Sequence, residues 1–319
     1  MRVVALVPGS IGDQILFFPT LDSLKRHYPD AQIDVVVEPR SKAAYRVSKS
    51  VHEVLTFDYK DRNSLADWGN LVGTIRDREY DVAISAGESW YVGLFLWLTG
   101  IPTRIGFQGN GAGFLTNVVP VNTSQYVAAM YHDLLKPLGI KAPCPELAVN
   151  ILKPDLEWAQ QQQQRLGISD SGYILVYGGS GQLSQINGAD TNYPVASWQQ
   201  IIQSCQQKQP DLPVVVIKEA EDESFISSLV ASCPGVKVFA TDDVGKLTAI
   251  IGGASLMLTI NGAPLHLGVA VQTYTIALLG AVDPGKLLPT SDKFLALKSM
   301  SGKIADIAPV TVLEKIWGG

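Results

Sequence analysis

Short apolar runs rich in β-branched residues alternate along the chain with segments of helical length, and this alternation limits the fold more than any other feature. Polar residues are scarce within the runs, which is typical of parallel strands buried on both faces. In the first half the strand runs are 3–7, 32–37, 54–57 and 82–85, and the helical segments are 13–27, 64–78, 90–99 and 125–138. The alternation predicts right-handed βαβ units in a doubly wound α/β domain.

The same pattern restarts after residues 141–154, a segment with three prolines and no periodicity. We interpret this segment as a connection between domains. The later strand runs are 173–177, 214–217, 236–239, 256–260 and 274–278, and the helices are 195–208, 222–231, 244–252 and a short one near 262. Because 319 residues exceed what one hydrophobic core usually serves, we predict two Rossmann-like domains, residues 1–150 and 151–319.

Composition and charge narrow the classes of function. The chain is 46% apolar and 17% charged, which is typical of globular proteins, and its net charge of −5 gives no general attraction to nucleic acid. No secretory signal is visible, and the apolar stretch 90–101 is too short to span a bilayer. Three cysteines without metal-ligand spacing favour reduced thiols, so we expect a cytoplasmic protein.

The turn after the first strand run is the first candidate functional loop, because doubly wound domains bind ligands at the carboxyl ends of their strands. Residues 8–13 read Pro-Gly-Ser-Ile-Gly-Asp. The spacing differs from the dinucleotide fingerprint, which argues against a dinucleotide-dependent oxidoreductase. Asp13 would repel a phosphate and is better suited to accept a proton from a neutral ligand. The alternative is that Asp13 only caps the helix, which would stabilise it by about 0.3–1 kcal/mol.

Two loops of the second half are candidates for binding an anion. A glycine cluster, residues 178–181, follows the run 173–177 and either cradles a phosphate or only makes a turn. Residues 260–266 follow a buried strand and begin a helix, whose free backbone N–H groups would form an anion site. His266 is a candidate ligand there, although a lone histidine is more often a buried, hydrogen-bonded one. The chain has four histidines and none has metal-ligand spacing, so we expect no metal site and no cofactor.

Several segments together resemble glycosyltransferase family 9, the ADP-heptose:lipopolysaccharide heptosyltransferases. The similarity covers nearly the whole chain, and its most specific parts are the opening and the stretch 264–284. The matching residues are Gly12, Asp13, Pro19, Leu21, Leu24, Lys25 and Pro29; Gly100, Ile101 and 104–107; Tyr126, Leu134, Leu135 and 138–140; and Tyr193, Pro194, Trp198, Pro264, His266, Asp283 and Pro284.

This resemblance implies a GT-B fold, in which two Rossmann-like domains face a cleft. It implies a metal-independent, inverting transfer of a heptose-like sugar from a nucleotide diphosphate to a lipid-linked saccharide such as lipopolysaccharide. Asp13 would be the base, beside an acceptor-side loop of Gly9, Ser10 and Gly12 in the first domain. The second domain would bind the nucleotide sugar, with Asp222 near the ribose. The other donor residues would be Gly178, Gly179, Ser180, Gly188, Asn192, Asn261, Gly262, Ala263 and His266.

Two departures from the family pattern concern the donor side. The family usually has Lys before an aromatic-Pro pair, where this chain has Asn192 before Tyr193, and it has Asp where this chain has Asn261. An ammonium beside a diphosphate in a low-dielectric site stabilises the transition state by several kcal/mol, and asparagine offers only dipoles. Another cation (Lys218 or Lys286) then substitutes, or the donor differs, or catalysis has been lost.

Two functions of different classes therefore remain. The first is a glycosyltransferase that acts on a nucleotide-diphosphate sugar and a lipid-linked saccharide, with peripheral contact to the inner membrane. The second is a catalytically degenerate GT-B protein that acts as a binding or assembly partner of another protein. Asp13 favours the enzyme, whereas Asn192 and Asn261 favour the binding partner.

Overall fold

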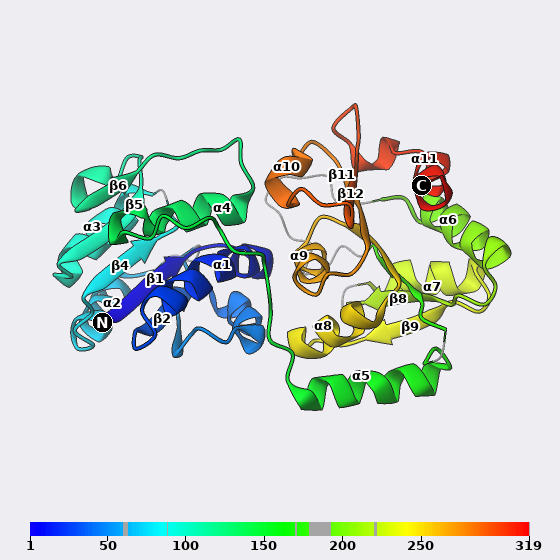
Figure 1. Ribbon diagram of the computed structural model, residues 1–319, viewed down its shortest axis with the longest axis horizontal. Coiled ribbons are helices and arrows are strands. Elements are labelled where there is room, and N and C mark those ends of the chain that lie inside the picture. Colours follow the sequence, from blue (N-terminus) through cyan, green and yellow to red (C-terminus); the bar gives the residue numbers. More distant parts are fainter. Residues whose placement is uncertain (60–62, 88, 170, 179–192, 220–221, 319) are drawn as a thin grey trace. The chain divides into compact units, whose positions relative to one another are not determined.

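The computed structural model describes residues 1–59, 63–87, 89–169, 171–178, 193–219 and 222–318. The chain divides into two compact units, Met1–Ala148 and Val149–Gly319, and Figure 1 shows a sheet with surrounding helices in each. Residues 141–152 have no regular secondary structure, and the first helix of the second unit begins at Lys153.

The first unit contains a parallel sheet in the order β3-β2-β1-β4-β5-β6. Its strands are β1 (Arg2–Val7), β2 (Gln32–Val37), β3 (Glu53–Thr56), β4 (Val82–Ser85), β5 (Thr103–Phe107) and β6 (Asn117–Val119). Its helices are α1 (Ile11–His27), η1 (Pro39–Val47), α2 (Leu65–Arg76), α3 (Trp90–Thr99), η2 (Ala112–Phe114), α4 (Val127–His132) and η3 (Asp133–Leu138). Helix α1 contacts α4 and η1, and α2 contacts α3.

The second unit repeats this architecture with the strand order β12-β11-β10-β7-β8-β9, again all parallel. Its strands are β7 (Ile174–Tyr177), β8 (Val214–Lys218), β9 (Lys237–Ala240), β10 (Leu256–Ile260), β11 (Thr275–Leu279) and β12 (Phe294–Lys298). Its helices are α5 (Lys153–Leu166), α6 (Val195–Lys208), α7 (Glu223–Ser232), α8 (Val244–Gly253), α9 (Ala263–Ala270), α10 (Pro284–Leu287), η5 (Ile304–Asp306) and α11 (Pro309–Trp317).

In each sheet the order of the strands reverses beside the first strand. The reversal lies between β1 and β4 in the first unit and between β7 and β10 in the second. Doubly wound sheets bind ligands outside the carboxyl ends of the strands at such switch points. The predicted loops 8–13 and 260–266 follow β1 and β10, and Gly178 follows β7, so the topology places these at switch points; residues 179–181 lie outside the described part of the chain.

The predicted doubly wound α/β class is confirmed, with some elements missed. Absent from the prediction were the strands β5, β6 and β12, the helices α10 and α11 and the helical segments η1, η2 and η5, and the predicted helix 125–138 is split into α4 and η3. Pro137 lies in η3, where it cannot donate the backbone hydrogen bond of a continuous helix. Across the part of the chain that the structure describes, every helix is too short or too polar to cross a membrane.

Candidate functional site

The turn after β1 is fixed by contacts that a larger residue at position 9 would break. Gly9 has φ of +122°, and a Cβ there would lie 2.5 Å from the Asp13 Oδ2 atom. The hydroxyl of Ser41 in η1 donates to the Gly9 carbonyl at 2.6 Å. This turn therefore needs glycine for both its conformation and its space.

Asp13 lies half-buried in the first turn of α1 and bonds with the residue that precedes the helix. Its Oδ2 atom accepts hydrogen bonds from the Ser10 amide at 2.7 Å and from the Ser10 hydroxyl at 2.8 Å. The capping role that the sequence offered as the alternative is thus present in the structure. Both bonds use Oδ2, and Oδ1 has no hydrogen bond within the described residues. Capping consequently leaves one carboxylate oxygen for a ligand.

A buried polar chain behind this turn was missed by the sequence reasoning. Gln14 is fully buried, and its amide donates to the Val7 carbonyl at the end of β1 at 3.0 Å. The Tyr45 hydroxyl donates to the Gln14 side-chain oxygen at 2.9 Å, and burial raises the Tyr45 pKa well above its usual value. The chain links β1, α1 and η1, and it holds the Gly9 turn in place. Only a polar residue one position after Asp13, in an apolar helix, could have signalled it.

The turn after β7 is packed against an indole. A Cβ at Gly178 would lie 2.3 Å from the Trp198 Nε1 atom, so the backbone approaches the ring where only glycine fits. Trp198 is fully buried in α6, and its Nε1 has no hydrogen-bond partner among the described residues. Tyr193 packs edge-on against the indole with ring centroids 5.1 Å apart. A buried donor without a partner is costly, which favours a ligand or water as its acceptor.

The start of α9 carries two more buried polar atoms without partners in the described part of the chain. Asn261 and Gly262 lie between β10 and α9, and the Asn261 Oδ1 atom is buried and unpaired there. His266 is 3% exposed and its Nδ1 is likewise unpaired; burial lowers its pKa to about 4. Thr259 pairs with Tyr177 in the register of β10 and β7, so the turns at Asn261 and Gly178 adjoin. The predicted residues Gly178, Asn261, Gly262, Ala263 and His266 thus come together at one switch point.

Asp222 is buried in the turn that joins β8 to α7. It is 1% exposed, precedes α7, and accepts a hydrogen bond from the Glu219 amide at 3.2 Å. The Glu219 carboxylate, one residue beyond β8, accepts from the buried Tyr177 hydroxyl at 2.5 Å. Glu219 was missed, although an acid two residues after a predicted strand was a usable signal. Gly179, Ser180, Gly188 and Asn192 lie outside the described residues.

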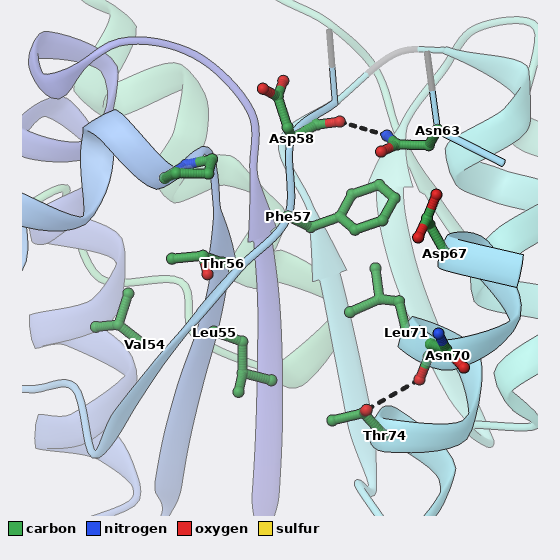
Figure 2. A pocket seen from close by; sticks show the side chains of 11 residues that line it. Val54, Leu55, Thr56, Phe57, Asp58, Asn63, Asp67, Asn70, Leu71 and Thr74 are labelled. Atoms are coloured by element: carbon green, nitrogen blue, oxygen red, sulfur yellow. Dashed lines mark hydrogen bonds between the residues drawn. The ribbon is translucent and has the colours of Figure 1, made fainter. Parts of the chain in front are cut away.

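A groove of about 490 Å³ lies beside the edge strand β3 of the first unit (Figure 2). The floor includes the side chains of Phe57 and Leu71. Polar side chains from the end of β3, from the segment between β3 and α2, and from α2 surround it: Thr56, Asp58, Asn63, Asp67, Asn70 and Thr74. The described lining holds carboxylates, amides and hydroxyls and no Lys or Arg, which suits a neutral ligand with several hydroxyl groups.

A cluster with metal-type ligands lies at the start of β2 and β3, formed by Asp34, His52 and Glu53. Arg78 occupies it: its guanidinium lies 3.3 Å from the Asp34 carboxylate and forms an ion pair with Glu53. The Tyr80 hydroxyl donates to Asp34 at 2.6 Å. The Arg78 hydrogen bond lowers the Glu53 pKa. A resident guanidinium makes this an internal charge network rather than a cation site.

Proteins of two kinds have sequences similar to this one. The chain is 25% identical to the Arabidopsis thaliana photosynthetic NDH subunit of subcomplex B 1, chloroplastic, over 98% of this chain and 72% of that protein. It is also 25% identical to lipopolysaccharide heptosyltransferase 3 of Escherichia coli K12, over 85% of this chain and 80% of that one.

Solved structures share the fold. A family 9 glycosyltransferase from Veillonella parvula superposes with a TM-score of 0.83 at 18% identity, covering 98% of this chain and 95% of that one. Escherichia coli heptosyltransferase WaaC, solved with ADP-2-deoxy-2-fluoro heptose, has a TM-score of 0.77 at 17% identity and 99% coverage of both chains. The architecture is therefore the GT-B fold of the heptosyltransferases. The sequence model of glycosyltransferase family 9 (heptosyltransferase) matches residues 68–316. This chain therefore belongs to glycosyltransferase family 9, the heptosyltransferase family.

Proposed function

We propose that the chain transfers a sugar from a nucleotide diphosphate to a saccharide acceptor, by a single inverting displacement without a metal ion. The observation that carries the proposal is the set of three buried polar atoms, unpaired among the described residues, at the β7–β10 switch point: Trp198 Nε1, Asn261 Oδ1 and His266 Nδ1. Unpaired buried atoms on elements that meet at one switch point favour a bound polar ligand. Membership of a heptosyltransferase family supports a sugar donor as that ligand, and a relative of the same fold was solved with an ADP-linked sugar.

The start of α9 supplies the donor side. Its first backbone N–H groups and the helix dipole favour an anion, here the diphosphate. His266 is neutral at pH 7 because its pKa is about 4, so it would contribute a hydrogen bond without a charge. ADP-heptose is the donor to test first, because WaaC, which shares the fold, was solved with an ADP-linked fluoroheptose.

Asp13 supplies the base. Its Oδ1 would take the proton of an acceptor hydroxyl while that oxygen attacks the anomeric carbon and the bond to the diphosphate breaks. The leaving diphosphate gains negative charge, and the start of α9 would stabilise it. The acceptor would contact Gly9, Ser10 and Gly12, with lipopolysaccharide as the acceptor class and the inner membrane surface as its source.

A cation beside the diphosphate would complete the site. Lys218 forms an ion pair with Glu223, so its charge is already partly neutralised. Lys286 in α10 is half-buried and has no ion pair among the described residues, which makes it the better substitute for the family lysine at the Asn192 position. It follows β11, a neighbour of β10 in the sheet.

The second candidate is a binding or assembly protein that keeps the fold without catalysis. Asp13 is engaged with Ser10, and Asn261 stands where the family has an acid. Similarity to a subunit of a photosynthetic NDH subcomplex favours the same alternative, because that relative is named for an assembly rather than for a transfer reaction.

One experiment separates the two. Wild type is screened by thermal shift against ADP, UDP, GDP and their sugar conjugates, and then assayed for release of nucleoside diphosphate with ADP-heptose and a lipid A-type acceptor. A ligand at about 100 times its Kd stabilises the native state by about 2.7 kcal/mol. Binding with transfer supports the enzyme, and binding without transfer, not restored by Asn192→Lys, supports the second candidate. The absence of both binding and transfer would contradict the donor site itself.

A further inference from the structure

Helix α3 is apolar on both its faces, and only one face is covered. Val92, Phe95 and Leu96 belong to the core of the first unit. The opposite face presents Trp90 and Trp97, each 55% exposed, with Leu98 at 48%. A helix that is apolar all round is normally buried all round. The exposed face therefore indicates a surface that is covered in the working protein.

We infer that this face binds a second copy of the chain across a two-fold axis at Leu94. The exposed apolar residues are arranged symmetrically about that position. Tyr91 and Trp97 lie three residues to either side of Leu94, and Trp90 and Leu98 lie four residues to either side. A two-fold contact must pair each residue i with j and j with i. Antiparallel packing of two α3 helices would pair Trp90 with Leu98 and Tyr91 with Trp97, and Leu94 with itself.

Charge supports a self-contact at this face. A two-fold axis brings identical groups together, so any charged side chain near the axis would meet a like charge. No Asp, Glu, Lys or Arg occurs from 89 to 103, so the exposed face of α3 can meet its own copy without charge repulsion. The absence of Lys and Arg from this part of the sequence also disfavours anionic lipid, because membrane-surface helices usually carry them on their polar face.

The face is rigid and of useful size. A Cβ at Gly93 would lie 2.5 Å from the Gly111 carbonyl oxygen, so the backbone of α3 is held close against the following loop. Phe114 from that loop contacts the Trp97 ring at a centroid distance of 6.5 Å and extends the exposed apolar face. Two half-exposed Trp side chains present roughly 200 Å². That is about a quarter of the ~800 Å² per partner in a standard interface, as expected of its central anchors.

Sedimentation velocity on the full chain from about 1 to 100 µM tests the proposal. We expect a concentration-dependent dimer, and Leu94→Glu should raise its dissociation constant at least about 30-fold, because two carboxylates would face each other at the axis. Met300→Glu is the matched control: it adds the same charge at a fully exposed position of the second unit and should leave the dimer intact. Melting curves of both variants check that each remains folded.

A cross-link locates the axis. Leu94→Cys in a Cys144→Ser background should form a disulfide between two copies on mild oxidation, since the remaining Cys205 and Cys233 are buried. A wild-type monomer at every concentration would overturn the proposal, and flotation of that monomer with neutral phosphatidylcholine vesicles would assign the face to lipid. A dimer that survives Leu94→Glu, together with no cross-link in the Leu94→Cys variant, would overturn it as well.

Discussion

The Ser10 amide and hydroxyl both donate to one oxygen of the Asp13 carboxylate, at 2.7 and 2.8 Å, which leaves the other oxygen without a partner in the described residues. The same side chain can therefore cap α1 and accept a proton. Catalysis and capping respond differently to substitution, so the two roles can be separated.

Asp13→Asn should lower the rate of sugar transfer by about 10²–10⁴-fold, because the amide cannot act as a base. Unfolding free energy should fall by no more than about 1 kcal/mol. Ser10→Ala is the matched comparison, since it removes a capping bond and keeps the carboxylate: it should cost about as much stability and lower transfer by no more than about 10-fold, through the loss of one acceptor contact. Equal losses of transfer in the two variants would show that only the shape of the turn matters.

Gly178→Ala should destabilise the second unit by about 1–3 kcal/mol, because the new Cβ would lie 2.3 Å from the Trp198 indole nitrogen. Trp198→Phe removes that part of the ring, so the double variant should recover part of the loss, and denaturant unfolding measures the coupling. Gly73→Ala, in α2 where a Cβ meets nothing within 4 Å, should instead stabilise by about 0.5–1 kcal/mol. Strict additivity of the two site variants would contradict the proposed contact.

The buried His266 should make the folded protein less stable in acid. Burial lowers its pKa from 6.5 to about 4, so between these values the unfolded chain binds a proton that the folded chain does not. Stability should therefore fall as the pH is lowered from about 6.5 to 4, by up to about 3 kcal/mol. His266→Gln should flatten this part of the curve, and chemical unfolding at several pH values measures it. A variant with the wild-type slope would locate the effect at another group.

Arg78→Met should destabilise the first unit, by about 1–3 kcal/mol, because it withdraws the guanidinium from the buried Asp34. Glu53 gives the pH dependence. Its pKa is lowered by Arg78, so its contribution is present above the ordinary value of 4.5 and is lost as the pH falls through the lower folded value. The stability difference between wild type and Glu53→Gln should thus shrink below about pH 4.5. The effect is small because the Glu53 side chain is 43% exposed.

The sequence predicted the fold where strands are long and apolar and missed it where they are not. Strands such as β10 and helices such as α6 were located because their patterns are unbroken. β6 has three residues, and β12 (Phe294–Lys298) is only partly buried, so neither has a strong pattern. Pro19 did not end α1, because it is buried within that helix. Tertiary packing there outweighs the usual cost of proline.

The sequence indicated which loops form the candidate site, but not the side-chain contacts within it. Asn261, Gly262 and His266 were named as candidates because they follow a buried strand and begin a helix. Gln14, Trp198 and Glu219 act through partners that are distant in sequence, such as Tyr45 and Gly178. Periodicity carries no information on such pairs, so only the coordinates could reveal them. Asp222 illustrates the converse, because its side chain supports its own turn.

The all-parallel sheets set the order in which the chain can complete its structure during synthesis. β1 is made first and lies between β2 and β4, so one of its edges stays unpaired until about residue 85 has emerged. β7 keeps an unpaired edge for longer, since its second neighbour, β10, begins more than 75 residues after β7 ends. Neither sheet can begin from a local hairpin, and each pairing must first close a long loop. β1 and β7, which precede two of the proposed ligand loops, therefore keep one edge unpaired until the second half of each sheet has begun to form.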